Sequence, residues 1–144
     1  MSIPFTRIVV AVDGSPASVA AVQAAASISA AMAAPVILAH ILQASPGRFG
    51  VIQDSQSLAE AMMADAVTTF EGGGGKLDTT VMSNETLHGV AWGILDIAKK
   101  AGADLVCVGT SGHGPWGGAI LGSVSQRLLN HCPCPVLVVP APAT

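Results

Sequence analysis

The segment spanning residues 109–125 has the composition of an anion-binding loop. It reads GTSGHGPWGGAILGSVS, with six glycines and no Lys, Arg, Asp or Glu. Any anion bound here must therefore be held by backbone N–H groups and by hydroxyls. Gly109 and Gly112 would let the backbone approach a ligand closely, and residues 122–125 open a predicted helix whose free N–H groups and positive dipole end attract phosphate. The alternative is a flexible loop in which Ser123 is only a helix N-cap.

Two catalytic motifs are present only in part. The nucleophile elbow G-x-S-x-G could begin at Gly109, but His113 stands where its last glycine should be. The glycine run before Lys76 fails as a P-loop, because G-x4-G-K-[ST] would require glycine at Phe70 and Ser or Thr at Leu77. The sequence therefore favours anion binding over hydrolase chemistry.

Short apolar runs alternate with helical patterns along the chain. Residues 7–12 (RIVVAV) and 36–42 (VILAHIL) are nearly continuous apolar runs, as in strands buried on both faces. Ser15 and Pro16 supply an N-cap and an N1 proline for the helix that follows. The expected strands are residues 7–12, 36–42, 77–82, 105–108 and 135–139. The expected helices are residues 16–33, 57–70, 94–101 and 123–130, and residues 43–56 are expected to form a loop.

This alternation predicts an α/β fold with a single doubly wound, Rossmann-like parallel sheet of five strands and helices on both faces. The third strand is half polar and the fifth is bracketed by prolines, so both should be edge strands. The simplest strand order that results is 3-2-1-4-5. Ligands of such sheets bind beyond the carboxyl ends of the strands where the order reverses, which places the expected site between Asp13 and Gly109.

Length and charge exclude several classes of protein. The 144 residues are expected to form a single domain over residues 1–144. The net charge is −3 and there are only six Lys and Arg, so the chain lacks the basic stripe that nucleic-acid binding requires. The uncharged stretch between Gly14 and Gly47 is rich in Ala and Ser and is broken by Pro35. We therefore expect no transmembrane helix, no signal peptide and a cytoplasmic location.

Other side chains could also do chemistry, and each has a structural alternative. Cys132 and Cys134, beside His131, could hold a soft metal ion, but their spacing matches no common zinc pattern. We expect reduced, structural thiols, because cysteines two residues apart close only a strained disulfide ring. His40 lies in an apolar run and is expected in the core. Asp13 could serve the ligand site or could only form a turn.

The full pattern G-x2-G-x9-G-[ST] is present at Gly109, Gly112, Gly122 and Ser123. Further stretches follow the pattern of the same family, namely VDGS at 12–15, HI at 40–41, ADLV at 103–106 and CPVLVV at 134–139. With these residues the chain resembles the nucleotide-binding type of universal stress protein, over essentially its whole length.

The resemblance implies a site for ATP, or for AMP or ADP, together with Mg2+ at the switch point. In similar proteins the adenine lies near the residues that match Ala11 and Ile41, and Asp13 would lie close to the ribose or to a phosphate-bound Mg2+. The binding residues that it implies are Ala11, Val12, Asp13, Ile41, Val108, Gly109, Gly112, His113, Gly122, Ser123, Val124 and Ser125, with Asp13 as the candidate Mg2+ ligand.

The implied function is that of a sensor or regulator in a stress response, with at most slow ATP hydrolysis. The loop offers no arginine and no evident general base, so phosphoryl transfer would lack most of its electrostatic stabilisation. The alternative is a family member that does not bind nucleotide and works as a dimeric interaction module. The resemblance and the apolar fifth strand indicate a homodimer through Val136, Leu137, Val138 and Val139, with a signalling partner that the sequence does not identify.

Overall fold

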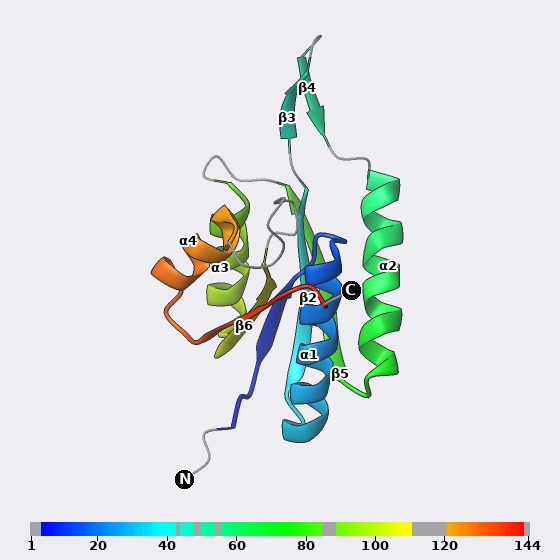
Figure 1. Ribbon diagram of the computed structural model, residues 1–144, viewed down its shortest axis with the longest axis vertical. Helices are drawn as coiled ribbons and strands as arrows, with labels where there is room; N and C mark the ends of the chain where they lie inside the picture. The colour runs from blue at the N-terminus through cyan, green and yellow to red at the C-terminus, as the bar shows by residue number, and fades with distance from the viewer. Residues whose placement is uncertain are drawn as a thin grey trace.

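The computed structural model describes residues 4–42, 44–47, 50–53, 56–84, 89–110 and 121–142 (Figure 1). Its helices are α1 (Pro16–Met32), α2 (Gln56–Gly72), α3 (Val90–Ala101) and α4 (Ser123–His131). Its strands are β1 (Ile8–Ala11), β2 (Pro35–Leu42), β3 (Ala44–Gly47), β4 (Gly50–Gln53), β5 (Lys76–Asn84), β6 (Leu105–Gly109) and β7 (Val136–Val139).

Five of the strands form one parallel sheet in the order β5-β2-β1-β6-β7. In the numbering of the expected strands this is the order 3-2-1-4-5, so the predicted topology is confirmed. The central strand β1 pairs on both sides, with Ile8 opposite Val36 of β2 and opposite Leu105 of β6. The order reverses between β1 and β6, and their carboxyl ends therefore form the switch point of the sheet.

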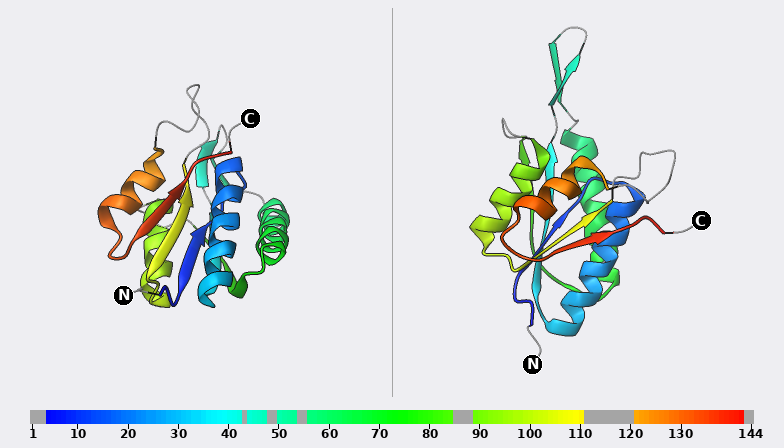
Figure 2. Two further views of the ribbon diagram at one scale, coloured as in Figure 1. Left: turned by 60° about the horizontal axis from the view of Figure 1, so that its bottom comes forward. Right: turned by 60° about the vertical axis from the view of Figure 1, so that its left-hand side comes forward.

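The sheet is covered by helices on both faces, α1 and α2 on one and α3 and α4 on the other (Figures 1 and 2). Alternate residues of β1 face the two layers, as the strand period of two requires. Ile8 and Val10 belong to the cluster that includes α1 and α2, and Val9 belongs to the cluster with α3 and α4. Because both faces of the central strands are covered, their sequences are almost continuously apolar.

The ends of the helices follow the local signals in the sequence. The hydroxyl of Ser15 accepts a hydrogen bond from the N–H of Ser18 at 3.1 Å and caps α1, with Pro16 in the first turn. Gly102 ends α3 in the left-handed conformation, with φ 67°, which glycine adopts at low cost. Both ends lie where the sequence predicts them.

The expected loop at residues 43–56 is partly wrong, because it contains an antiparallel hairpin of β3 and β4. The hairpin projects from the sheet beyond the end of β2 (Figure 1). Ser, Pro and Gly in this segment indicate a loop, but Val51 and Ile52 are β-branched and pair opposite Pro46 and Ser45. Helix α2 also begins at Gln56, one residue before its predicted start at residue 57. None of the helices in the described part of the chain is long and apolar enough to cross a membrane.

Candidate functional site

A cavity of about 160 Å3 lies at the switch point of the sheet. Its walls come from the ends of β1, β2 and β6, from the start of α3 and from the first turn of α4. Ten of the sequence-predicted binding residues line it, namely Ala11, Val12, Asp13, Ile41, Val108, Gly109, Gly122, Ser123, Val124 and Ser125. Gly112 and His113 lie outside the described residues. The fold thus brings residues from opposite ends of the chain into one concave site.

The first wall is the turn that joins β1 to α1. The N–H of Asp13 donates to the hydroxyl of Ser18 at 3.0 Å, and the N–H of Ser15 donates to Asp13 Oδ1 at 2.8 Å. This is the local hydrogen bonding of an Asx turn, so Asp13 has the turn role that the sequence offered as its alternative. Asp13 is exposed at the cavity, and its Oδ2 has no partner among the described residues. One carboxylate oxygen is therefore available to a ligand or cation.

The second wall is the N-terminus of α4, which no described side chain caps. Gly122 is the N-cap residue, and its carbonyl accepts from the N–H of Gln126 and from the hydroxyl of Ser125, both at 3.0 Å. The exposed hydroxyl of Ser123 has no hydrogen-bond partner among the described residues. The first N–H groups of a helix lack partners within the helix. Here they adjoin the cavity, where an anion could accept from them.

The third wall is apolar. Ile41 and Val108 are buried at the ends of their strands, and Ile94 is buried on α3. Helix α3 approaches β2 closely because residue 93 is glycine, and a Cβ there would lie only 2.8 Å from Cδ1 of Ile41. Ala11 and Val90 complete this apolar surface. A flat, largely apolar ring could pack against it while an anionic group reached the start of α4.

Gly109 is the last residue of β6 and lies against the first turn of α1. A Cβ at this position would lie 2.5 Å from the carbonyl carbon of Ala17 and 2.7 Å from the backbone nitrogen of Ser18. The sequence interpretation assigned this glycine to close ligand approach. The structure adds a second reason for glycine, which is close packing of one backbone against another at the edge of the cavity.

Four cavity residues are absent from the sequence-predicted set: Ser18, His40, Val90 and Ile94. His40 is buried, as expected of a core histidine, and its Nδ1 lies 2.7 Å from the carbonyl oxygen of Val12. Because a carbonyl can only accept, Nδ1 carries the proton and donates it, which leaves Nε2 as the other polar atom of the ring. His40 stands beside Ile41 in the sequence, at the carboxyl end of a central strand. This position could have identified His40 as a cavity residue.

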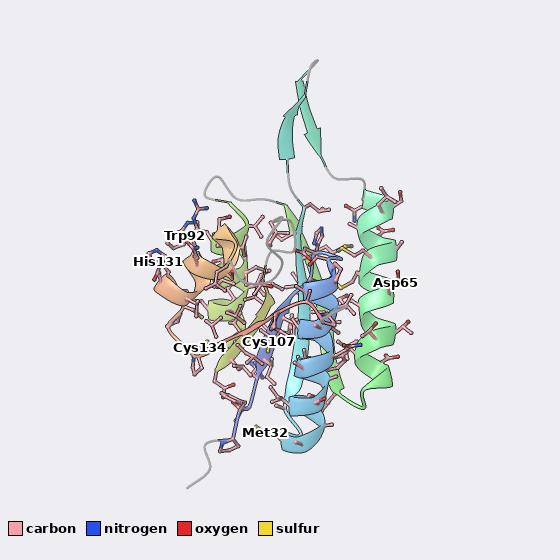
Figure 3. All side chains as sticks on the ribbon, in the orientation of Figure 1. Met32, Asp65, Trp92, Cys107, His131 and Cys134 are labelled. Carbon is pink, nitrogen blue, oxygen red and sulfur yellow. The ribbon has the colours of Figure 1, made fainter. Side chains whose placement is uncertain are left out.

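A second cavity, of about 320 Å3, lies between α1 and α2. It shares only Val12 and Ser18 with the first, and its walls include Val22, Met62 and the carboxylate of Asp65. Figure 3 labels Asp65 on α2. This cavity lies away from the start of α4.

The comparisons with known proteins agree with this fold. Residues 4–140 match the Universal stress protein family. The chain is 31% identical over 140 residues to universal stress protein Rv2623 of Mycobacterium tuberculosis, an alignment that covers 92% of this chain and 46% of the relative. It therefore spans about half the length of that relative.

Two solved structures share the architecture. A universal stress protein in complex with cAMP superposes with a TM-score of 0.74 at 24% identity and covers 97% of this chain and 100% of its own. The universal stress protein from Archaeoglobus fulgidus in complex with dAMP gives a TM-score of 0.72 at 21% identity and covers 95% of this chain and 99% of its own. The family match extends over nearly all of the chain, from before β1 to just beyond β7, and this chain belongs to the universal stress protein family.

Proposed function

We propose that this chain binds an adenine nucleotide, ATP or its products ADP and AMP, in the switch-point cavity and acts as a sensor or regulator in a stress response. The observation that carries the proposal is one cavity that joins an apolar wall to an uncapped helix N-terminus. Two structural relatives are described with adenine nucleotides, cAMP and dAMP, which supports this class of ligand.

In this proposal the adenine packs against Ala11 and Ile41, and the phosphates accept hydrogen bonds from the first N–H groups of α4 and from the Ser123 hydroxyl. A cavity of about 160 Å3 is smaller than pockets that enclose a whole ligand, which start at about 300 Å3. It suits one ring system, so the rest of the nucleotide would extend outward along the α4 terminus.

The side chains present fit a phosphate-bound Mg2+. Mg2+ in nucleotide sites is usually held by one or two carboxylates, by phosphate oxygens and by water. Asp13 is the one carboxylate among the described residues that line the cavity, and its Oδ2 has no partner there. Mg2+ would neutralise phosphate charge that no described lysine or arginine at the cavity can neutralise.

The residues that line the switch-point cavity do not favour efficient ATP hydrolysis. A general base must reach the proton that it removes, directly or through one water. The basic atoms left free at the cavity are Nε2 of His40, whose ring is buried, and Oδ2 of Asp13, which this proposal assigns to Mg2+. No arginine stands among the described lining residues to stabilise a transferring phosphoryl group. We therefore propose binding and signalling, with at most slow ATP hydrolysis.

Replacing Ser123 with alanine should weaken MgATP binding by roughly 10- to 150-fold, which corresponds to the loss of one hydrogen bond to a charged oxygen, about 1.5 to 3 kcal/mol. Because Gly122 is the N-cap residue and Ser123 lies inside the first turn, the cap itself is retained. The free energy of unfolding should therefore change by no more than about 0.5 kcal/mol.

The measurement is calorimetric titration with MgATP and with MgAMP. The matched control is Ser27→Ala on α1, an exposed hydroxyl that bonds to the carbonyl of Gln23 far from the cavity. Equal affinities in wild type, Ser123→Ala and the control would show that the phosphates bind elsewhere.

A second candidate function, an interaction module without nucleotide, rests on β7. Its four residues are all apolar, yet each is only half-buried, and β7 is an edge strand of the five-stranded sheet with no second partner among the described residues. Such an edge can pair with another chain. We propose that two copies associate through Val136, Leu137, Val138 and Val139, whether or not nucleotide is bound.

Replacing Val138 with aspartate should convert this dimer to a monomer, because a half-buried carboxylate on this strand would lose its remaining water when two edges pair. Since Val138 also packs against the cluster under α3 and α4, the fold of the variant is measured separately. Light scattering should report twice the chain mass of 14.3 kDa for wild type and the single mass for the variant. Thr80→Asp, at an exposed position of the opposite edge strand β5, is the control and should stay dimeric. Thermal unfolding of the same samples shows whether each is folded. A wild-type chain that is monomeric at micromolar concentration would contradict the proposed interface.

A further inference from the structure

Two thiols meet at the junction between α4 and β7. Cys132 is the C-cap residue of α4, where its N–H donates to the carbonyl of Leu128 at 2.9 Å, and Cys134 lies two residues before β7. Their Sγ atoms are 3.4 Å apart, and both residues are free and half-buried, so a small molecule can reach them. Figure 3 labels Cys134 near the start of β7.

We propose that Cys132 and Cys134 form a reversible oxidation site, which reacts with a small hydroperoxide and closes an intrachain disulfide.

The geometry supports a bond between these two sulfur atoms. A disulfide needs an S–S distance of about 2.05 Å, so the sulfur atoms would have to approach from 3.4 Å across a single intervening proline. The ring that closes between residues two apart is small and strained. Strain makes a disulfide easier to reduce, and disulfides of this kind are labile and regulatory instead of structural. The thiols are thus expected to be reduced at rest and oxidised only by a strong oxidant such as a peroxide.

The surroundings favour thiol chemistry over a metal site. His131, the neighbour of Cys132, packs its ring against Trp92, with ring centroids 4.8 Å apart, and Figure 3 labels the two residues next to each other. In the part of the chain that the structure describes, no group of three or more His, Cys, Asp or Glu side chains could hold a metal ion. Among the described residues the pair therefore has no third and fourth ligands of the kind that zinc requires.

Cys134 is the thiol of the pair that its surroundings hold in the protonated form. Burial raises the pKa of Cys134 to about 12, and the hydrogen bond with Cys132, the charge on Cys132 and the charge on Asp104 add to the rise. Cys134 therefore holds its proton more strongly than a free thiol does, and we take its neighbour at 3.4 Å, Cys132, as the attacking sulfur, which the single variants below test. Cys107 is fully buried in the core, where burial alone raises its pKa to about 12, and it is expected to be inert.

The reaction balances in two steps. The Cys132 thiolate attacks one oxygen of hydrogen peroxide, the O–O bond breaks, and hydroxide leaves and takes up a proton, which gives a sulfenic acid and one water. The sulfur of Cys134 then attacks the sulfenic sulfur as it loses its proton. The S–O bond breaks and the departing hydroxide takes up that proton as a second water. The two thiols lose two electrons, and the peroxide gains them.

The test is peptide mapping of the reduced protein before and after hydrogen peroxide, with the remaining thiols alkylated under denaturing conditions. Arg127 is the last Lys or Arg in the sequence, so residues 128–144 form one tryptic peptide that carries Cys132 and Cys134. Cys107 lies in a different tryptic peptide. Before peroxide all three thiols should be alkylated. Afterwards the C-terminal peptide should be about 2 Da lighter than its unalkylated dithiol form and carry no alkyl group, and dithiothreitol should restore both thiols. A peptide that keeps both thiols, becomes sulfinic or cross-links to a second chain would overturn the proposal.

Single variants test the two roles. Cys134→Ser should stop the reaction at a sulfenic acid on Cys132, which dimedone traps, and Cys132→Ser should react at least about tenfold more slowly. Equal rates in these two variants would overturn the assignment of Cys132 as the attacking sulfur. Cys107→Ala is the matched control and should form the disulfide as wild type does.

Discussion

Replacing Gly122 with valine is expected to abolish MgATP binding while leaving the chain folded. Gly122 lines the cavity at the start of α4, and a branched side chain there would occupy the space proposed for the phosphates. Its backbone has φ −72° and ψ 169°, which valine adopts readily, so the substitution introduces no backbone strain. The loss of MgATP affinity should exceed the loss caused by Ser123→Ala, because the valine side chain would block all the contacts at the start of α4 at once.

Calorimetric titration measures this loss, and circular dichroism confirms the fold of each variant. Gly72→Val is the matched control, because a Cβ at Gly72 meets nothing within 4 Å and the position lies at the end of α2. The control should bind as wild type does. Binding by Gly122→Val with wild-type affinity would remove the start of α4 from the site.

Replacing Gly109 with alanine is expected to lower the free energy of unfolding by about 1 to 3 kcal/mol, the usual cost of overpacking a close contact. The added Cβ would lie 2.5 to 2.7 Å from backbone atoms of Ala17 and Ser18, which can yield only if α1 moves away from β6. Because Gly109 and Ser18 both line the cavity, MgATP affinity should fall as well.

Urea unfolding followed by circular dichroism measures this effect. Gly72→Ala is the control, and it should leave stability unchanged or raise it by about 0.4 to 1 kcal/mol, because the unfolded chain loses freedom and nothing clashes in the fold. A stable Gly109→Ala variant with unchanged affinity would mean that α1 and β6 do not approach as closely as described.

The sheet order was predictable because each strand carries its own signal. The alternation of polar and apolar residues in β5 and the prolines around β7 marked the two edges, and the apolar runs of β1, β2 and β6 marked the centre. The hairpin of β3 and β4 was missed because turn residues dominate its composition. Its pairing depends on which residues come to lie opposite one another, and local composition does not report that.

Part of the candidate site was predictable as well, because some of its residues belong to local sequence patterns. The glycine and serine pattern and the switch-point rule located residues of β1, β6 and α4 that line one cavity. Ser18 and His40 were missed because their roles arise from tertiary placement, Ser18 as acceptor for the N–H of Asp13 and His40 as donor to the Val12 carbonyl. The packing role of Gly109 likewise depends on how closely α1 crosses β6.

The central claim is that the switch-point cavity binds an adenine nucleotide, and calorimetric titration of the folded wild-type chain with MgATP tests it most directly. The account predicts one site per chain with micromolar affinity, and MgAMP binding more weakly because it presents fewer phosphate oxygens to the start of α4. A folded wild-type chain that shows no binding at millimolar MgATP would contradict the claim and favour the interaction module built on β7.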